Sequence, residues 1–522
     1  MTQSSHATNR QAIHARRPSA PAVVRPALAI VLAVALPDLA QAQTWSVRPA
    51  VQATVTATTN AARSGSDQER KDVIGAIQPT IELVGESTSF RINATVGADL
   101  VAYANGTQPN RAYPLIVATQ QATFVPRLLF LESSVSVRAA ERDPFAARSA
   151  AGTTENRQTT AAYRISPYID YQVSPASSVF ARYDESWSNT DAVDAADQHF
   201  TNVEVRLSRR PLPFGGSVEY TKQIARFSGQ GESRATFDTV KARGDIAIGG
   251  ELIVGPVLGR ERSTLFLETN DDNLYGAHLQ WTPSERTRLA AEAARRFFGT
   301  GWTLDAQHRL PWMTISLQWN RSPITTATSL GVAAAGSNLN TFLDGILTTR
   351  YPDPAARAVV VTNLIANRGL PTSVQGPIDV QAEYAQLQNN LRATWVLLGS
   401  RNIISVTTYA QTLRQLTRAG AAPTLPAGNL DNRQVGVTLG LNRRLSPQLT
   451  LDASANWSRI NGLADHSGDV SREQIYRVAI VRAVSPRAGI SAGLQHDRLA
   501  TTLPGIDSFK ATSAFVGVNH RF

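Results

Sequence analysis

Cysteine is absent from the 522 residues of this chain, and methionine occurs only twice. Without cysteine the chain cannot form disulfides, a thiolate zinc or iron–sulfur site, or a cysteine nucleophile. Charged residues make up 18% of the chain and hydrophobic residues 42%, which is too apolar for general disorder. Beyond the first 40 residues no run of about 20 apolar residues occurs, so a helical membrane protein is excluded as well.

Lysine is also scarce. Beyond residue 42 it occurs only as Lys71, Lys222, Lys241 and Lys510. The excess of 51 basic over 41 acidic residues therefore comes from arginine, which is scattered singly through the chain. No basic run and no nucleic-acid motif accompany this excess, so we expect no nucleic-acid partner.

The N-terminus has the layout of a secretory signal peptide. A polar, basic stretch precedes the apolar run Ala27–Leu36, which is followed by Ala40-Gln41-Ala42. About ten apolar residues are too few to cross a bilayer as a helix, and an A-x-A sequence suits signal peptidase. We expect residues 1–42 to be removed before Gln43, leaving residues 43–522 as one exported domain. A membrane anchor or a buried helix is the alternative.

The strongest pattern beyond the leader is alternation with a period of two. From Leu449 to Ser458 every odd position is apolar and every even position is polar, and Met313–Asn320 repeats the pattern. Such segments form strands with one apolar and one polar face. Leu289–Arg296 could form a helix on propensity alone, but its neighbours are strand-like, so we predict a strand there as well.

Four Ser/Thr-Pro turns divide strand-like runs into hairpins with short connections, because proline pre-sets φ at the second turn position. They begin at Ser174, Thr282, Ser446 and Ser485. Longer polar connections separate the hairpins, and counting the runs gives about 22 strands (range 16–22), each of about 9 to 14 residues. All four turns then fall on one side of the sheet. A long insertion at about residues 322–378, with a short helix near Leu339–Leu347, falls on the other side.

This arrangement predicts an all-β fold: a single transmembrane, antiparallel, up-and-down β-barrel in the cell outer membrane. Such barrels have short periplasmic turns, long extracellular loops and low overall hydropathy. A soluble β-sandwich or propeller would need mixed strand patterning, which is not evident. Tryptophans on the apolar faces near strand ends predict two aromatic girdles at the membrane interfaces. These residues are Trp187, Trp281, Trp319 and Trp457.

The C-terminal sequence supports the barrel. Val516, Val518 and Phe522 share one face of a final alternating strand. This strand resembles the last strand of outer-membrane barrels, which the barrel-assembly machinery recognises by a C-terminal aromatic residue. Phe522 is therefore the expected assembly signal, although His520 stands where an aromatic or aliphatic residue is commoner. The surrounding partner is expected to be outer-membrane lipid, including lipopolysaccharide.

Polar residues that alternate with apolar ones should line the lumen, as a mixed, arginine-rich surface. The candidates are Arg164, Asp170, Arg182, Asp184, Glu219, Asp452 and Asn456. A barrel of about 22 strands is wide enough for a water-filled or plugged pore. The alternative is that these side chains pair with each other across strands and seal the interior. No plug domain precedes Trp45, which argues against a TonB-dependent transporter.

One region resembles a known family. The hairpin from Trp281-Thr282-Pro283 to Thr287, continuing through Arg296-Phe297-Phe298-Gly299 to His308-Arg309, is similar to the outer-membrane barrels associated with PEP-CTERM/exosortase systems. The start of the exported chain at Trp45 is similar too. The resemblance implies a role in envelope export or exopolysaccharide secretion, with the polymer or its export proteins as partners. It supplies no catalytic residues.

Enzymatic chemistry finds little support. Asp197 and His199 could share a side of a loop, whereas Asp305 and His308 should point to opposite faces of a strand. His466-Ser467 lies in a Gly/Asp loop rather than in the strand of a phospholipase-like barrel. No partner geometry follows from these spacings. We therefore predict that the protein is not an enzyme and has no catalytic residues, no cofactor and no metal site.

Three functions remain open at this stage. The first is a pore or conduit linked to exopolysaccharide/PEP-CTERM export. The second is a closed structural or assembly barrel that binds a surface partner through its long loops. The third and weakest is an outer-membrane hydrolase.

Overall fold

A computed structural model of the chain describes the strands and most of their connections. It covers residues 44–148, 156–191, 197–228, 232–265, 268–324, 384–417 and 431–522, with residues 339–348, 350–351, 353, 357–358, 360–361, 364–365 and 376–378 between them. The expected signal peptide, residues 1–42, lies outside this range, so its cleavage stays a prediction. None of the helices in the described parts is long and apolar enough to span a membrane.

The described chain is a succession of 22 strands. In chain order they are β1 (Thr44–Thr58), β2 (Asp72–Glu86), β3 (Phe90–Tyr103), β4 (Arg111–Val125), β5 (Leu129–Glu141), β6 (Arg157–Ser174), β7 (Ser177–Thr190), β8 (Asp197–Arg209), β9 (Phe214–Ser228), β10 (Glu232–Ile248), β11 (Leu252–Leu265), β12 (Glu268–Ser284), β13 (Thr287–Arg296), β14 (Gly299–Leu310), β15 (Met313–Ile324), β16 (Gln386–Leu398), β17 (Asn402–Gln415), β18 (Asn432–Ser446), β19 (Leu449–Gly462), β20 (Val470–Ser485), β21 (Ala488–Thr501) and β22 (Phe509–Arg521). Nine of the strands, with 15 to 18 residues each, exceed the predicted strand length. The predicted strand at Leu289–Arg296 is confirmed within β13.

The strands close into one barrel. Each strand pairs antiparallel with the next, and β1 pairs with β22 through Ala50–Thr58 and Ser513–Arg521. Closure leaves no unpaired edge, which an open sheet could not avoid in a membrane. The predicted single up-and-down antiparallel barrel is confirmed, at the upper end of the predicted range of strand number.

The two faces of the wall differ as the alternation predicts. Large apolar side chains are exposed at every second position, for example Val478 and Ile480 on β20 and Val516 and Val518 on β22. Residues directly opposite each other on paired strands share a face, so these side chains form an apolar outer surface that suits lipid. The intervening positions carry the polar side chains that line the lumen.

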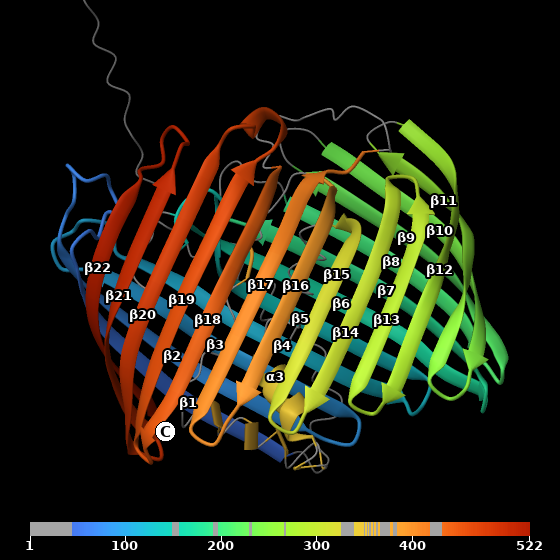
Figure 1. Cartoon of the computed structure of the whole chain (residues 1–522), viewed down its shortest axis with the longest axis horizontal. Coiled ribbons are helices and arrows are strands. Elements are labelled where there is room, and N and C mark those ends of the chain that lie inside the picture. Colours follow the sequence, from blue (N-terminus) through green and yellow to red (C-terminus); the bar gives the residue numbers. More distant parts are fainter. Residues whose placement is uncertain are drawn as a thin grey trace, which may run out of the picture.

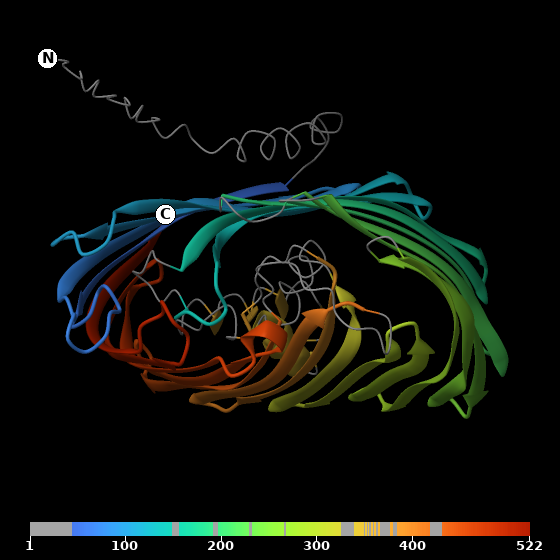
Figure 2. The ribbon, with the colours of Figure 1, turned by 90° about the horizontal axis from the view of Figure 1, so that it is seen from above.

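The two ends of the barrel also differ. The connections from even to odd strands are short, and the predicted Ser/Thr-Pro turns all lie at this end, which we call the short-turn end. The opposite end, called the loop end, carries the longer connections (Figure 1). Seen along the barrel, the ring is flattened, so that the blue-to-green strands form one wall and the yellow-to-red strands form the wall facing it (Figure 2).

The connection between β15 and β16 corrects one prediction. It begins at the loop end, yet its helix α3 (Leu339–Leu347) packs at the short-turn end (Figure 1). The predicted helix is therefore present. Within the insertion expected to be extracellular at about 322–378, α3 lies inside the barrel instead, because it contacts inward-facing residues of β16 and β17. The connection is also displaced, since β15 extends to Ile324 and β16 begins at Gln386.

Candidate functional site

The barrel lumen is the candidate site, and the register of the strands places all seven predicted lining residues on its wall. They fall into two groups. Arg164, Asp170, Arg182, Asp184 and Glu219 lie on β6, β7 and β9, whereas Asp452 and Asn456 lie on β19 in the facing wall. The sequence could place them on one face but could not group them.

Most of these residues pair with neighbouring strands. Arg164 Nη2 lies 2.5 Å from Asp184 Oδ1, and Asn202 donates a hydrogen bond of 2.9 Å to Oδ2 of the same carboxylate. Arg182 pairs with Glu132 at 3.2 Å. On the facing wall, Asn456 donates to Thr438 at 2.7 Å. Such pairs satisfy polar side chains across neighbouring strands, as the alternative of a sealed interior requires, but each lies along the wall and does not span the lumen.

The described part of the connection between β5 and β6, residues 142–148, reaches from the first wall to the other wall and docks there. Arg148, in the connection between β5 and β6, lies with its Nε 3.1 Å from Oε2 of Glu473 on β20. Its two other guanidinium nitrogens donate to the Tyr409 hydroxyl at 2.8 Å and to the Gly376 carbonyl at 2.6 Å. Because three separated segments meet at one buried guanidinium, the loop is fixed as a partition inside the barrel.

Two further residues, Arg63 and Gly436, support this partition. Arg63, between β1 and β2, donates to the Arg148 carbonyl at 2.6 Å and pairs with Asp497 on β21 at 3.2 Å. The ring of Tyr409 lies over Gly436 on β18, where a Cβ atom would stand 2.5 Å from the ring. Only glycine therefore leaves room for Tyr409 to reach Arg148.

The α3 helix forms a second obstruction, at the short-turn end. Leu343 and Ile346 of α3 are almost fully buried and pack against Val396 and Ile403 of the barrel wall. Thr348, just after the helix, accepts a hydrogen bond from inward-facing Arg309 at 3.4 Å. The apolar face of α3 therefore holds it inside the barrel, where Figure 2 shows it in gold.

A third obstruction is apolar and lies at the loop end. The phenylalanine cluster consists of Phe200, Phe227 and Phe237 from β8 to β10 with Phe297 and Phe298 from the hairpin between β13 and β14. Ala385 and Leu416 beside β16 and β17 complete it, so it joins the two walls of the barrel. The Phe237 and Phe297 rings stack with their centroids 5.7 Å apart.

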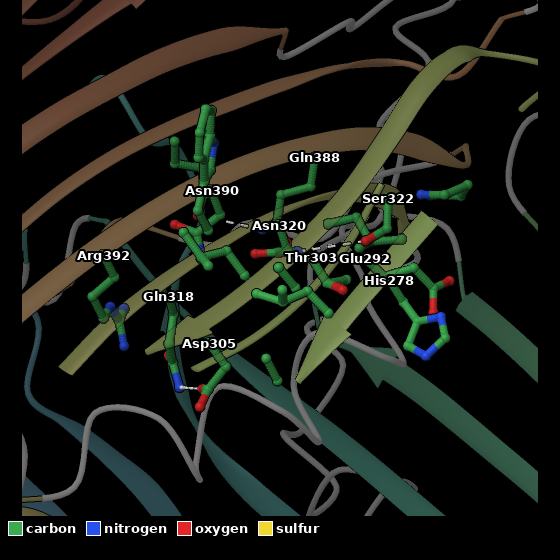
Figure 3. Close-up of a pocket in the computed structure, with 18 of the residues that line it drawn as sticks. His278, Glu292, Thr303, Asp305, Gln318, Asn320, Ser322, Gln388, Asn390 and Arg392 are labelled. Carbon is green, nitrogen blue, oxygen red and sulfur yellow. Dashed lines mark hydrogen bonds between the residues drawn. The ribbon is translucent and has the colours of Figure 1, made fainter. Parts of the chain in front are cut away.

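A polar chamber of about 670 Å³ remains between these obstructions. Its polar side chains are carboxamides and hydroxyls with a few charged groups, and apolar side chains such as Phe237 and Ile324 complete the lining. Figure 3 shows these side chains, which come from β12 to β16: His278, Glu292, Thr303, Asp305, Gln318, Asn320, Ser322, Gln388, Asn390 and Arg392. Phe200 and Phe237 close it toward the first wall, and a neighbouring cavity of about 410 Å³ shares Glu292 and Thr303.

The sequence analysis does not predict the chamber, although the alternation of residues in β16 indicates part of its lining. In β16 the polar residues Gln388, Asn390 and Arg392 alternate with Leu391 and Ala393. This pattern places the polar side chains inside, but it does not show that this part of the lumen stays open. The two carboxylates of the chamber differ in their partners. Glu292 pairs with Lys241 Nζ at 3.2 Å and with Arg243 Nη2 at 3.0 Å. Asp305 accepts a hydrogen bond of 3.3 Å from Gln318 Nε2.

The histidines do not form catalytic arrangements with their predicted neighbours. His199 faces outward, stacks on Trp187 and contacts Glu185 and Arg226 rather than Asp197. His308 bonds Thr287 at 2.8 Å on the outer face, opposite to Asp305, as predicted. Within the described ranges no three His, Asp or Glu side chains are grouped in a way that could hold a metal ion.

His466 bonds Asp469 at 3.0 Å instead of Ser467. The predicted aromatic residues Trp187, Trp281, Trp319 and Trp457 all take outward positions, with Trp281 near the short-turn end and Trp457 toward the loop end. Phe522 follows β22 with its side chain exposed, and its N–H bonds the Pro49 carbonyl at 3.0 Å. Its role as an assembly signal stays a prediction.

The closed sheet, the apolar outer surface and the polar lumen together define a transmembrane β-barrel. No family model and no curated protein matches the chain. Solved structures do match. The siderophore receptor PirA from Pseudomonas aeruginosa has 10% identity and a TM-score of 0.44, over 92% of this chain and 81% of that one.

The ferric citrate transporter FecA has 10% identity and a TM-score of 0.47, over 91% of this chain and 78% of that one. OccK1 (OpdK) from Pseudomonas aeruginosa has 8% identity and a TM-score of 0.35, over 91% of this chain and 99% of that one. At such identities the similarity is one of barrel shape.

Proposed function

We propose that the protein is an outer-membrane pore whose passage runs through the polar chamber and admits small polar solutes. The observation that supports this proposal is the chamber itself, a space lined by many polar side chains inside a barrel with an apolar exterior. Its volume lies in the range of sites that enclose small molecules. The three obstructions make the passage narrow, so the pore discriminates rather than acting as an open conduit.

The orientation follows the usual relation between loops and membrane sides. The short-turn end faces the periplasm and the loop end faces outward, because outer-membrane barrels have short periplasmic turns. The α3 helix would then narrow the periplasmic mouth, and the phenylalanine cluster the outer one. The partition at Arg148 would confine solutes to the side of the lumen lined by β8 to β16.

The cargo we propose is a hydroxyl-rich solute of an exopolysaccharide/PEP-CTERM export system. Two features support this. Carboxamides and hydroxyls such as Gln388, Asn390 and Thr303 in the chamber can both donate and accept hydrogen bonds, which suits sugar hydroxyl groups. The resemblance of the Trp281–Arg309 region to exosortase-associated barrels supplies the second.

Planar-bilayer recording of the refolded full-length protein tests the pore. We expect small, ohmic conductance steps that oligosaccharides reduce by entering the chamber. Asn390→Leu should weaken this block, whereas Leu494→Ala, on the outer face, should leave it unchanged. A folded barrel that passes no ions would contradict the pore.

A gene deletion tests the cargo separately. Loss of secreted polymer, restored by the wild-type gene and not by Asn390→Leu, supports the export role. Normal polymer secretion from the deletion strain would contradict the export role. It would not affect the proposal that the protein is a pore, which the bilayer recording tests.

The closed barrel is the second candidate, and the obstructions favour it. Its proposed mode of action changes, however, because α3 lies inside the barrel and is not available to a surface partner. An insulating barrel in the recording above would select this candidate.

A further inference from the structure

The outer surface near the loop end carries basic side chains in an unusual arrangement. Arg459 on β19 lies directly opposite Arg472 on β20, and Arg498 on β21 lies directly opposite Lys510 on β22. All four occupy the outward positions of their strands. We call these four residues the basic patch. A similar pair, Arg226 and Arg234, lies opposite each other on β9 and β10.

Like charges directly opposite across a sheet destabilise it. The strands of this region do not offset the charge, because their carboxylates, Asp452, Glu473 and Asp497, all lie on the inward face. Among the described residues, none of the four basic side chains forms an ion pair with a carboxylate. On these four strands the carboxylates thus lie inside, whereas the four residues of the basic patch lie outside without an acidic partner on their own face.

The position of the basic patch along the barrel axis indicates which part of the membrane surrounds it. Arg459 is two residues beyond Trp457 on the same outer face, so about 7 Å separates them along the strand. Tryptophans on the outer surface mark the boundary of the hydrocarbon region. The basic patch therefore lies at the level of the lipid headgroups, where phosphate groups are available as counter-ions.

We propose that the basic patch binds the phosphate groups of a phosphorylated glycolipid in the leaflet at the loop end. The patch spans four neighbouring strands, about 14 Å across, which exceeds a single phospholipid headgroup. Neutral side chains that can bond sugar hydroxyls, Asn461, Gln474 and Thr512, share its face. Arginine is well suited to phosphate because it presents several donors in a planar fork.

The inference is independent of the proposed pore, since the patch and the chamber lie on opposite faces of the wall. It is tested with the full-length barrel in zwitterionic detergent, titrated with lipid A, with dephosphorylated lipid A and with phosphatidylglycerol. Native mass spectrometry counts the bound lipid. The variant is Arg472→Gln with Arg498→Gln, which removes one charge from each pair.

The matched control is Arg443→Gln with Arg482→Gln. These two arginines also face outward, but at the short-turn end, and each lies opposite a leucine. We expect lipid A to bind the wild type and the control, and to bind the patch variant at least tenfold more weakly, because the variant lacks two of the four basic groups that attract the phosphates. Dephosphorylated lipid A and phosphatidylglycerol should bind all three proteins weakly.

A melting experiment separates binding from misfolding. Without anionic lipid the patch variant should melt at a higher temperature than the wild type, because one repulsive charge of each pair is gone; lipid A should reverse the order. Equal lipid A affinity for the patch variant and the wild type would overturn the proposal. So would equally tight binding of phosphatidylglycerol or of dephosphorylated lipid A.

Discussion

Arg148 and Glu473 join the two walls of the barrel through a buried contact of 3.1 Å between Nε and Oε2. Arg148 belongs to the connection between β5 and β6, and Glu473 belongs to β20. Both side chains are at most about one-tenth exposed, at 7% and 10%. Breaking one partner of such a pair leaves a buried charge without its counter-ion, which is more costly than the pair itself.

Arg148→Ala should therefore release the crossing loop. The docked state should lose about 3–5 kcal/mol, the usual cost of removing one partner of a buried pair. Because the loop narrows the lumen, the single-channel conductance of the refolded protein should rise. Arg210→Ala, at an exposed turn position, is the matched control and should conduct like the wild type. Unchanged conductance in Arg148→Ala would show that the loop does not restrict the passage.

Leu343→Ala should loosen α3. The side chain is fully buried against the wall, and truncation of a buried leucine costs about 2–5 kcal/mol. The helix should then leave the short-turn end more often, and current noise and mean conductance should both increase. Leu494→Ala, which shortens a leucine on the outer face, provides the comparison. Equal noise in the two variants would count against α3 as an obstruction.

Charged groups of the chamber should set ion selectivity. Asp305→Asn removes a carboxylate from the lining and should shift the zero-current potential toward anion selectivity. Arg392→Gln removes a cation from the same lining and should shift it the opposite way. The measurement is the reversal potential across a salt gradient. Shifts of the same sign, or no shift in either variant, would place the ion path outside the chamber.

The pH response of the crossing loop should depend on Asp143. Burial raises the pKa of the Asp143 carboxyl above its ordinary value of 3.8, against the opposing effects of the Phe145 N–H and His466. The docked loop therefore holds this proton more firmly than the released loop does. Protonation of Asp143 therefore favours docking of the loop at low pH. This contribution to the free energy of docking is lost as the pH rises from 3.8 through the raised pKa.

Asp143→Asn isolates this contribution. An asparagine Oδ1 can still accept the 2.8 Å bond from the Phe145 N–H, but it does not titrate. Conductance of the wild type should fall more steeply than that of Asp143→Asn as the pH is lowered from 7 to 4. Identical profiles would mean that Asp143 does not take part in loop docking.

The sequence predicts the wall of the barrel well and its contents poorly. Alternation in segments such as Leu449–Ser458 is a local property, so it reports which side chains face the lumen and which face lipid. The Ser/Thr-Pro turns are predicted equally well, because the conformation of each turn depends on neighbouring residues. Strand number follows from the count of such segments.

The contents of the lumen depend on contacts between distant residues. Nothing near Arg148 indicates that it meets Glu473, which lies 325 positions further along. The sequence predicts the short helix at Leu339–Leu347, but it does not indicate that Val396 and Ile403 of the barrel wall are its partners. Arg459 and Arg472 were likewise seen as scattered charges, since only the pairing register brings them together.

Accessibility of the chamber tests the central claim most directly. Because the chain has no cysteine, Asn390→Cys creates a single reactive thiol inside the chamber. During bilayer recording, a charged, membrane-impermeant thiol reagent should reduce the current of Asn390→Cys and leave Leu494→Cys, on the outer face, unaffected. An undiminished current through Asn390→Cys molecules that mass spectrometry shows to be fully modified would contradict the account, because the ions would then pass by another route.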